Sequence, residues 1–244
     1  MKVIVINASP KMDKGNTAVI LTPFLEGMKE AGAEIEVFYA KKMKIAPCQG
    51  DLVCWFKTPG RCVMRDDMDI LLPKLAEADI WVFATPVYVD GMSGPLKNLI
   101  DRMIPLVYPF FEIRGGHCRH SLRESTNSGK IVMVASCGFW ETDNFDPLLD
   151  HVKAICRNVK REFAGALLRP HSRAVKTMLD RGEPLEDIFE AARESGRQLI
   201  REGAISGKTL SVISRDLLPL EDYLQMVNQR FHELLMESQG GQSQ

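Results

Sequence analysis

Short runs of apolar, mostly β-branched residues alternate with longer stretches in which apolar residues recur every three or four positions. The short runs are typical of strands buried on both faces of a parallel sheet, and the longer stretches of amphipathic helices. The predicted strands span 3–6, 34–39, 80–84, 131–135 and 163–168, and the predicted helices 17–31, 66–78, 93–104, 147–159 and 184–202. This alternation predicts βαβ crossovers, and therefore an α/β fold whose parallel sheet carries helices on both faces.

Two segments extend beyond this alternation. Residues 105–129 form an insertion before the fourth strand that is too long for an ordinary connection, which predicts a functional, interfacial or mobile segment. Residues 206–237 carry an apolar stripe at helical spacing, so we predict a helical extension that packs back on the domain or contacts another subunit. The domain itself is predicted over 1–205, and the polar, glycine-containing residues 238–244 predict a disordered tail.

Composition and charge narrow the range of partners. The 244 residues are 45% hydrophobic and 26% charged, as in ordinary globular proteins, and 31 basic against 32 acidic residues give a net charge of −1. This balance excludes a general electrostatic attraction to nucleic acids or anionic membranes. No apolar run has the length of a membrane span, and the first one is shorter than a signal-peptide core. We therefore predict a cytoplasmic protein whose six cysteines are thiols or metal ligands.

The loop after the first predicted strand has the properties of an anion site. Ligands of open parallel sheets bind beside the carboxyl ends of the strands, so the loops after strands one, three and four are the candidates. The first loop enters a helix N-terminus, whose free N–H groups favour an anion. Ser9, Asn16 and Thr17 add donors, and Lys11 adds a positive charge, without the spacing of dinucleotide or triphosphate loops. The loop suits one phosphate monoester, and a merely capped helix start is the alternative.

The other two loops offer surfaces to a flat ligand. The third strand ends in Thr-Pro-Val-Tyr over 85–88, a stiff turn with an aromatic ring that suits the polar rim of a heteroaromatic ring. The alternative for Tyr88 is a half-buried ring that closes the core. The fourth strand is broken at 136–138. Three charged residues of the helix after the second loop are interpreted mainly as a surface ion pair or a subunit contact: Lys97, Asp101 and Arg102.

The three loops, in this order, resemble those of a known family over residues 1–165. The motifs that carry the resemblance are Ser9-Pro10-Lys11 with Gly15-Asn16-Thr17, Thr85-Pro86-Val87-Tyr88 with Gly91-Met92-Ser93, and Leu96-Lys97 with Asp101-Arg102. They are similar to motifs of the NAD(P)H-dependent FMN reductases of the flavodoxin-like superfamily, of which iron–sulfur flavoproteins form one branch. The resemblance implies a flavodoxin-like, doubly wound parallel five-stranded sheet of order 2-1-3-4-5.

The resemblance also implies which residues bind FMN. Those expected to hold its phosphate are Ser9, Lys11, Asn16 and Thr17. Those expected to border the isoalloxazine are Thr85, Pro86, Val87, Tyr88 and Gly91 on one side, and Ser136, Cys137, Gly138 and Phe139 on the other. No side chain is expected to be catalytic, because the flavin carries the chemistry. The thiol of Cys137 is interpreted as a small buried group.

Three cysteines lie together between the second strand and the next helix. Iron–sulfur flavoproteins carry four here, spaced Cys-x2-Cys-x2-Cys with a fourth a few residues on, whereas this chain has Cys48, Asp51, Cys54 and Cys62. Cluster irons are held by thiolates, and a carboxylate oxygen replaces one poorly. Three interpretations remain open: a cluster on three cysteines, the remnant of a lost cluster with structural thiols, and a redox-active or other metal site. The remnant is favoured, because the segment around Trp55 has the composition of a self-packed loop.

These observations predict an FMN-dependent oxidoreductase without an iron–sulfur cluster. It would take hydride from NAD(P)H and pass electrons to a small acceptor such as free flavin, a quinone or a metal ion. The alternative is an electron-transfer flavoprotein that serves protein partners, although the near-neutral charge argues against a pure carrier. A flavodoxin-like binding module without flavin is a third possibility, opposed by the intact first loop. The sheet edge, the insertion and the late helix predict a homodimer or homotetramer.

Overall fold

Five parallel strands form the central sheet of the computed structural model, which describes residues 1–240. The strands are β1 (Lys2–Asn7), β2 (Glu34–Tyr39), β3 (Ile80–Pro86), β6 (Gly129–Ser136) and β7 (Arg161–Arg169). Their order is β2-β1-β3-β6-β7, with every neighbouring pair parallel. This confirms the predicted flavodoxin-like order, in which the sheet grows outward in both directions from β1.

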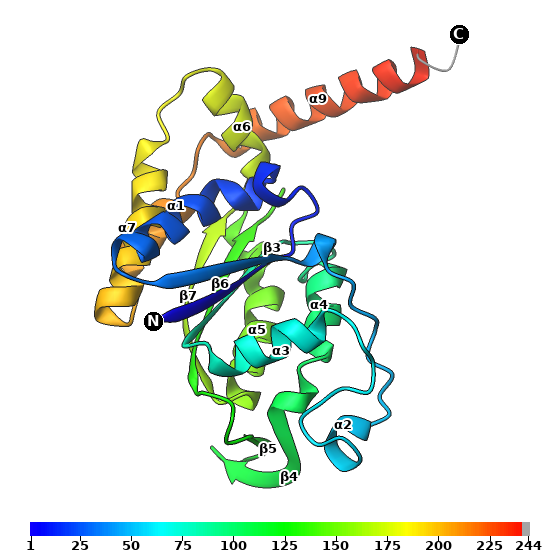
Figure 1. The fold of residues 1–244 in the computed structure, drawn as a ribbon. Helices are drawn as coiled ribbons and strands as arrows, with labels where there is room; N and C mark the ends of the chain where they lie inside the picture. Colours follow the sequence, from blue (N-terminus) through cyan, green and yellow to red (C-terminus); the bar gives the residue numbers. More distant parts are fainter. Residues whose placement is uncertain (241–244) are drawn as a thin grey trace.

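Helices cover both faces of this sheet (Figure 1). One face is covered by α1 (Asn16–Glu30), α7 (Glu186–Glu202) and α8 (Gly207–Ser214). The other is covered by α3 (Met68–Glu77), α4 (Gly94–Asp101) and α5 (Asp146–Asn158). The strand residues that alternate between the two faces are apolar on both sides, which explains the continuous apolar runs of the sequence.

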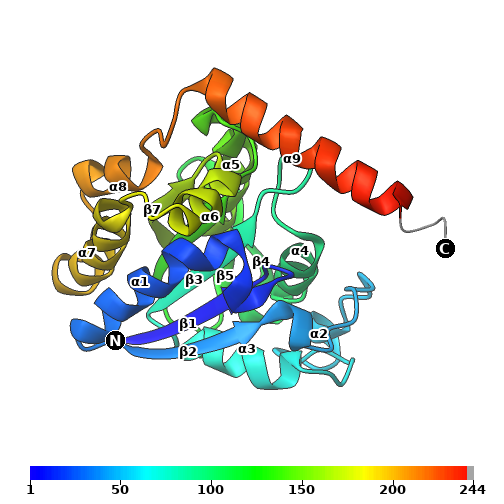
Figure 2. The same cartoon turned by 90° about the horizontal axis from the view of Figure 1, so that it is seen from above.

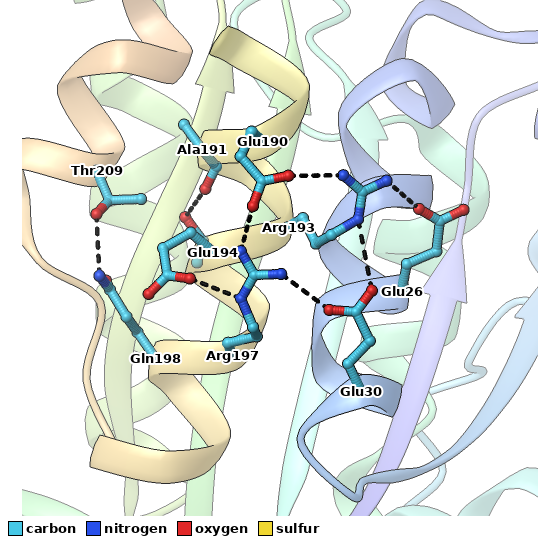
Figure 3. Close-up of polar contacts among 10 residues, drawn as sticks. Glu26, Glu30, Glu190, Ala191, Arg193, Glu194, Arg197, Gln198 and Thr209 are labelled. Carbon is cyan, nitrogen blue, oxygen red and sulfur yellow. Dashed lines mark hydrogen bonds and ion pairs between the residues drawn. The ribbon is translucent and has the colours of Figure 1, made fainter. Parts of the chain in front are cut away.

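Two glycines allow α1 and α7 to pack closely. A Cβ on Gly27 would lie 1.8 Å from the backbone oxygen of Arg193, and one on Gly196 would lie 2.2 Å from that of Phe24. Around this contact, an ion-pair network joins the exposed sides of the helices (Figure 3). In it, Arg193 lies 2.7 Å from Glu26. Helix α7 ends at Gly203, whose φ of 77° lies in the left-handed region that favours glycine.

The predicted insertion is an antiparallel hairpin, formed by β4 (Val107–Arg114) and β5 (His117–Leu122). It lies at the end of the domain opposite α9 (Leu220–Gly240) (Figure 1). Beside it lies the cysteine segment with its short helix α2 (Val53–Phe56).

The chain after β7 contains more helix than the sequence pattern predicts. Helix α6 (Ser172–Asp180) lies between β7 and α7, where we predict no element. The predicted helical extension consists of α8 and α9, and α9 runs past the body of the domain in both views (Figures 1 and 2). Residues 238–240 of the predicted disordered tail are helical, which corrects that part of the prediction, and residues 241–244 lie outside the described residues. Within 1–240, no helix combines the length and apolarity of a membrane span.

Candidate functional site

The loops after β1, β3 and β6 meet at the carboxyl edge of the sheet and line one open cleft of about 1030 Å³. Eleven of the thirteen residues expected around a flavin line this cleft: Ser9, Lys11, Asn16, Thr17, Pro86, Val87, Tyr88, Ser136, Cys137, Gly138 and Phe139. The other two, Thr85 and Gly91, lie outside its lining. This volume is at the upper end of the range for small-molecule sites, so the cleft has room for a mononucleotide.

The first loop places several donors at the start of α1. The backbone N–H groups of Asn16 and Thr17 stand in the first helical turn, where no intrahelical carbonyl reaches them. Ser9 is buried, and its N–H donates to Asn7 Oδ1 at 3.0 Å, which fixes the backbone of the loop. A Cβ on Gly15 would lie 2.4 Å from Ser9 Oγ. The loop is therefore tightly packed around the position where we expect a phosphate.

The second loop is held rigidly by Thr85. This buried hydroxyl accepts the N–H of Ser93 at 3.0 Å and donates to the Pro86 carbonyl at 2.9 Å, so Thr85 shapes the turn from behind. Beyond it, Tyr88 and Gly91 exchange two backbone hydrogen bonds, and Val89 between them has φ 46°. A β-branched residue in the left-handed region is strained, and such strain concentrates at ligand sites. Tyr88 is 52% exposed, so its ring rims the cleft and does not close the core.

The third loop connects the first loop to the edge of the cleft. Ser136 Oγ and Thr17 Oγ1 are buried and lie 2.8 Å apart, so the Thr17 hydroxyl is shared between the cleft and this contact. Cys137 is buried, as predicted, and burial raises the pKa of its thiol. The Phe139 N–H donates to its sulfur at 3.4 Å, and the Phe139 ring is exposed at the cleft rim.

A fourth loop and α9, both outside our expected site, complete the cleft. Ser172 and Arg173 follow β7, and Ser172 Oγ accepts a hydrogen bond of 3.2 Å from Asn16 Nδ2. Five residues of α9 also line the cleft: Tyr223, Leu224, Val227, Asn228 and Phe231. The loop after β7 ends at the same sheet edge as the others, so the rule that selected three loops also covers this one. The amphipathic stripe of α9 indicates a packed helix and does not reveal what it packs on.

A buried histidine fixes the start of α9. His171 is fully buried, accepts the Leu217 N–H on Nε2 at 3.0 Å and stacks on Trp140 at 5.8 Å. Burial, aided by the charge of Arg169, lowers the pKa of His171 to about 4. The imidazole is therefore neutral near pH 7, which it must be to accept that hydrogen bond.

The cysteine segment forms a second, much smaller cavity of about 20 Å³, lined by Cys48, Cys54, Cys62 and Asp51 among others. Asp51 Oδ1 accepts the Val53 N–H at 2.9 Å and so caps its own backbone. Burial raises the pKa of Cys54. Among residues 1–240, no group of three or more His, Cys, Asp or Glu side chains is arranged to hold a metal ion. With three thiols and a carboxylate turned to the backbone, the segment does not fit a four-thiolate cluster.

Contacts with the hairpin hold the cysteine segment in place. Trp55 Nε1 donates to the carbonyl of Val107 at 3.1 Å, and its ring lies 4.8 Å from His120 of β5. The segment also packs on itself, as predicted, with Thr58 Oγ1 donating to the Arg61 carbonyl at 2.7 Å. Its packing on the insertion is an addition that we did not predict.

Arg102 corrects one sequence interpretation. Lys97 and Asp101 form the expected exposed pair at 2.6 Å, but Arg102 is 2% exposed. Its guanidinium donates to Asp66 at 2.7 Å and to the Ala46 carbonyl at 2.6 Å. Helix α4 ends at Asp101, and the Arg102 side chain contacts the chain on both sides of the cysteine segment, at Ala46 and at Asp66.

Comparison with known proteins identifies the family of the chain that forms this cleft. The profile of the NADPH-dependent FMN reductase family matches residues 1–154, which contain the first three loops of the cleft. The chain belongs to this family. The match ends before β7, so the fourth loop and α9 lie outside the matched residues.

Several relatives of this FMN reductase family member are iron–sulfur flavoproteins. One from Methanocaldococcus jannaschii is 40% identical over 106 residues, 43% of this chain and 53% of that protein. One from Methanosarcina thermophila is 30% identical over 141 residues, 57% of this chain and 72% of that protein. The chain spans about half the length of the first of these relatives.

Solved structures of the same fold include two flavodoxin-like reductases. An FMN-dependent NADH-azoreductase of Bacillus anthracis has a TM-score of 0.58 at 15% identity, with 83% of this chain and 99% of that one covered. An NAD(P)H:quinone oxidoreductase of Methanothermobacter marburgensis has a TM-score of 0.56 at 19% identity, with 82% and 96% covered. At 15% and 19% identity, these similarities show that the folds are alike and carry no conclusion about activity.

Proposed function

We propose that the chain is an FMN-dependent oxidoreductase that takes hydride from NAD(P)H and passes electrons to a small organic acceptor. The observation that carries this proposal is the single cleft at the carboxyl edge of the sheet, lined by the three loops of an FMN reductase. When bound there, FMN supplies the redox chemistry: NAD(P)H, an acceptor quinone and one proton become NAD(P)⁺ and hydroquinone.

The cleft offers the two environments that FMN needs. At one end, the first turn of α1, Asn16 and Lys11 present donors and a positive charge to a phosphate dianion. At the other end, Val87, Tyr88 and Phe139 present apolar and aromatic surface to the isoalloxazine. Thr85 and Gly91 contribute through the shape of the second loop.

The lining favours an organic acceptor over a metal ion. Tyr88 and Phe139 leave their rings exposed at the rim, and α9 adds Leu224, Val227 and Phe231 to the lining. Aromatic and apolar surfaces bind planar rings by stacking and burial of area. A quinone or a free flavin fits such a surface, whereas a hydrated metal ion gains nothing from it.

The absorption spectrum of the anaerobically purified chain, loaded with FMN, tests this proposal. We expect two flavin bands that bleach when NADPH is added and return when a quinone is added. A chain that binds no FMN, or whose bands do not respond to NADPH or NADH, would contradict the proposal.

The same spectrum tests a second candidate function. The relatives named iron–sulfur flavoproteins favour, as this second candidate, an electron-transfer protein with a cluster. The three thiols at the small cavity are one fewer than the four thiolates that such a cluster usually takes. A broad shoulder together with about four irons per chain would support that candidate. Flavin bands alone, with iron well below one per chain, would support a segment that holds no cluster.

We further propose that the protein acts in the cytoplasm as a homodimer or homotetramer. The six cysteines are free, which suits a reducing compartment. Strand β4 of the hairpin exposes three large apolar side chains, Phe110, Phe111 and Ile113, and exposed large apolar side chains are typical of an interface. Light scattering should give a mass of at least two chains with FMN bound, and a monomer with FMN bound would contradict the assembly.

A further inference from the structure

Helix α9 forms one wall of the cleft although it lies outside the matched region of the family. Its Leu224, Val227 and Phe231 line the same space as the first and third loops. Because α9 lines the cleft together with the loops that we expect to border the isoalloxazine, this wall borders whatever binds beside the flavin. We therefore expect the side chains of this wall to affect which acceptor binds more than how tightly FMN binds.

The wall is rigid at its base. Tyr223 is buried and its hydroxyl donates to the Gly138 carbonyl in the third loop. Just before α9, the Leu218 carbonyl accepts Trp140 Nε1 at 3.1 Å, and Leu217 is bound by His171. These bonds connect α9 to the loops after β6 and β7, so its apolar face keeps one position relative to the third loop.

One cation stands between this wall and the third loop. The Arg173 guanidinium lies over the Phe231 ring, with Cζ 5.0 Å from the centroid, and its Nε is 3.5 Å from where a Cβ on Gly138 would be. On the same helix, Lys176 pairs with Asp180 at 3.2 Å, whereas Arg173 contacts a ring. A guanidinium stacked on an aromatic ring keeps its N–H fork available to a carboxylate or a sulfonate.

Of the cations that line the cleft, Arg173 contacts α9. Lys11 belongs to the first loop, where we place the phosphate, and Asp90 stands at the strained turn of the second loop. Ser172, next to Arg173, faces the first loop through Asn16, but the Arg173 guanidinium lies against Phe231 of α9.

We infer that Arg173 and the apolar face of α9 select acceptors that are planar, aromatic and negatively charged. The ring of the acceptor packs between Phe231, Val227 and the flavin, and its carboxylate or sulfonate binds the Arg173 guanidinium. Arg173 is thus a specificity-determining residue, and this inference rests on the proposed function, because it requires FMN in the cleft.

A matched pair of acceptors tests the inference in the FMN-loaded protein. We would measure kcat/KM with NADPH for 2-methyl-1,4-naphthoquinone and for 1,4-naphthoquinone-2-sulfonate, and take the ratio of the sulfonated to the neutral acceptor. The two quinones differ in potential, but that difference cancels when the ratio is compared between variants. In Arg173→Gln the ratio should fall about tenfold, because a charge-assisted bidentate contact is lost. The ratio in Arg173→Lys, which keeps the charge without the fork, should lie between the ratios of the wild type and Arg173→Gln.

Lys176→Gln is the matched control, since it removes a cation from the same helix outside the cleft. Its ratio should stay within twofold of the wild type. An equal ratio in wild type and Arg173→Gln would overturn the inference. Two other results with an unchanged ratio would also overturn the inference. A tenfold higher Kd for FMN in Arg173→Gln would mean that Arg173 binds the cofactor phosphate, and a higher KM for NADPH would mean that it binds the donor. A wild type that binds no FMN would contradict the proposed function as well, so the two failures are distinguishable.

Discussion

Gly15→Ala is expected to raise the Kd for FMN about 100-fold while the fold stays intact. Gly15 has an extended backbone, with φ −88° and ψ 159°, that alanine adopts without strain. The added Cβ, however, would lie 2.4 Å from Ser9 Oγ and 3.4 Å from Lys11 Cβ. The atom that it meets is the hydroxyl of the buried Ser9, one of the expected phosphate donors, which has to rotate away. The methyl group therefore displaces donors from the phosphate position.

Gly207→Ala provides the control for this prediction. Gly207 also opens a helix, α8, but a Cβ there meets nothing within 4 Å. Its Kd for FMN, measured by flavin fluorescence quenching, should stay within twofold of the wild type. If Gly15→Ala keeps a wild-type Kd, the first loop does not hold the phosphate. Thermal unfolding of both variants separates a local effect from a loss of the fold.

The parallel sheet was predictable because its strands are buried on both faces. Val3 to Ile6 and Ile80 to Ala84 are apolar without interruption, and such runs bounded by helical patterns leave one fold class open. The hairpin was not predictable in the same way. Phe110, Phe111 and Ile113 are exposed, so the pattern of β4 does not alternate between a buried and a polar face.

Of the candidate site, only the residues in loops directly after the strands could be predicted from the sequence. The ends of β1, β3 and β6 are marked by turn residues, and the sheet rule places them together. The contribution of α9 depends on a chain that returns to the cleft from more than 80 residues beyond Gly138, as the bond from Tyr223 shows. Long-range contacts of this kind leave no local signal in the sequence. Arg102 was misassigned for the same reason, because its partners Asp66 and Ala46 lie 36 and 56 residues away.

Arg102→Met is expected to lower the free energy of unfolding by about 3–5 kcal/mol at pH 7. The guanidinium is buried and binds both Asp66 and the Ala46 carbonyl, while Asp66 also accepts the N–H groups of Ala46 and Met68. These contacts close the chain around the cysteine segment. Removal of Arg102 leaves the Asp66 carboxylate little exposed and without its counter-charge, and the backbone amides of 46–66 should then exchange faster.

Lys97→Met on the same helix is the control, since the exposed pair with Asp101 contributes less than about 1 kcal/mol.

The pH dependence of stability is a second test of the buried pair. Burial opposes ionisation of Asp66, but the hydrogen bonds from Arg102, Ala46 and Met68 prevail and lower its pKa. The stabilisation is therefore complete above the unfolded-state pKa of about 3.9 and is lost as the pH falls through the lower folded value. The cost of Arg102→Met, measured by urea unfolding, should be smaller at pH 3 than at pH 7. A cost equal to that of Lys97→Met at pH 7 would show that the cysteine segment does not depend on this buried pair.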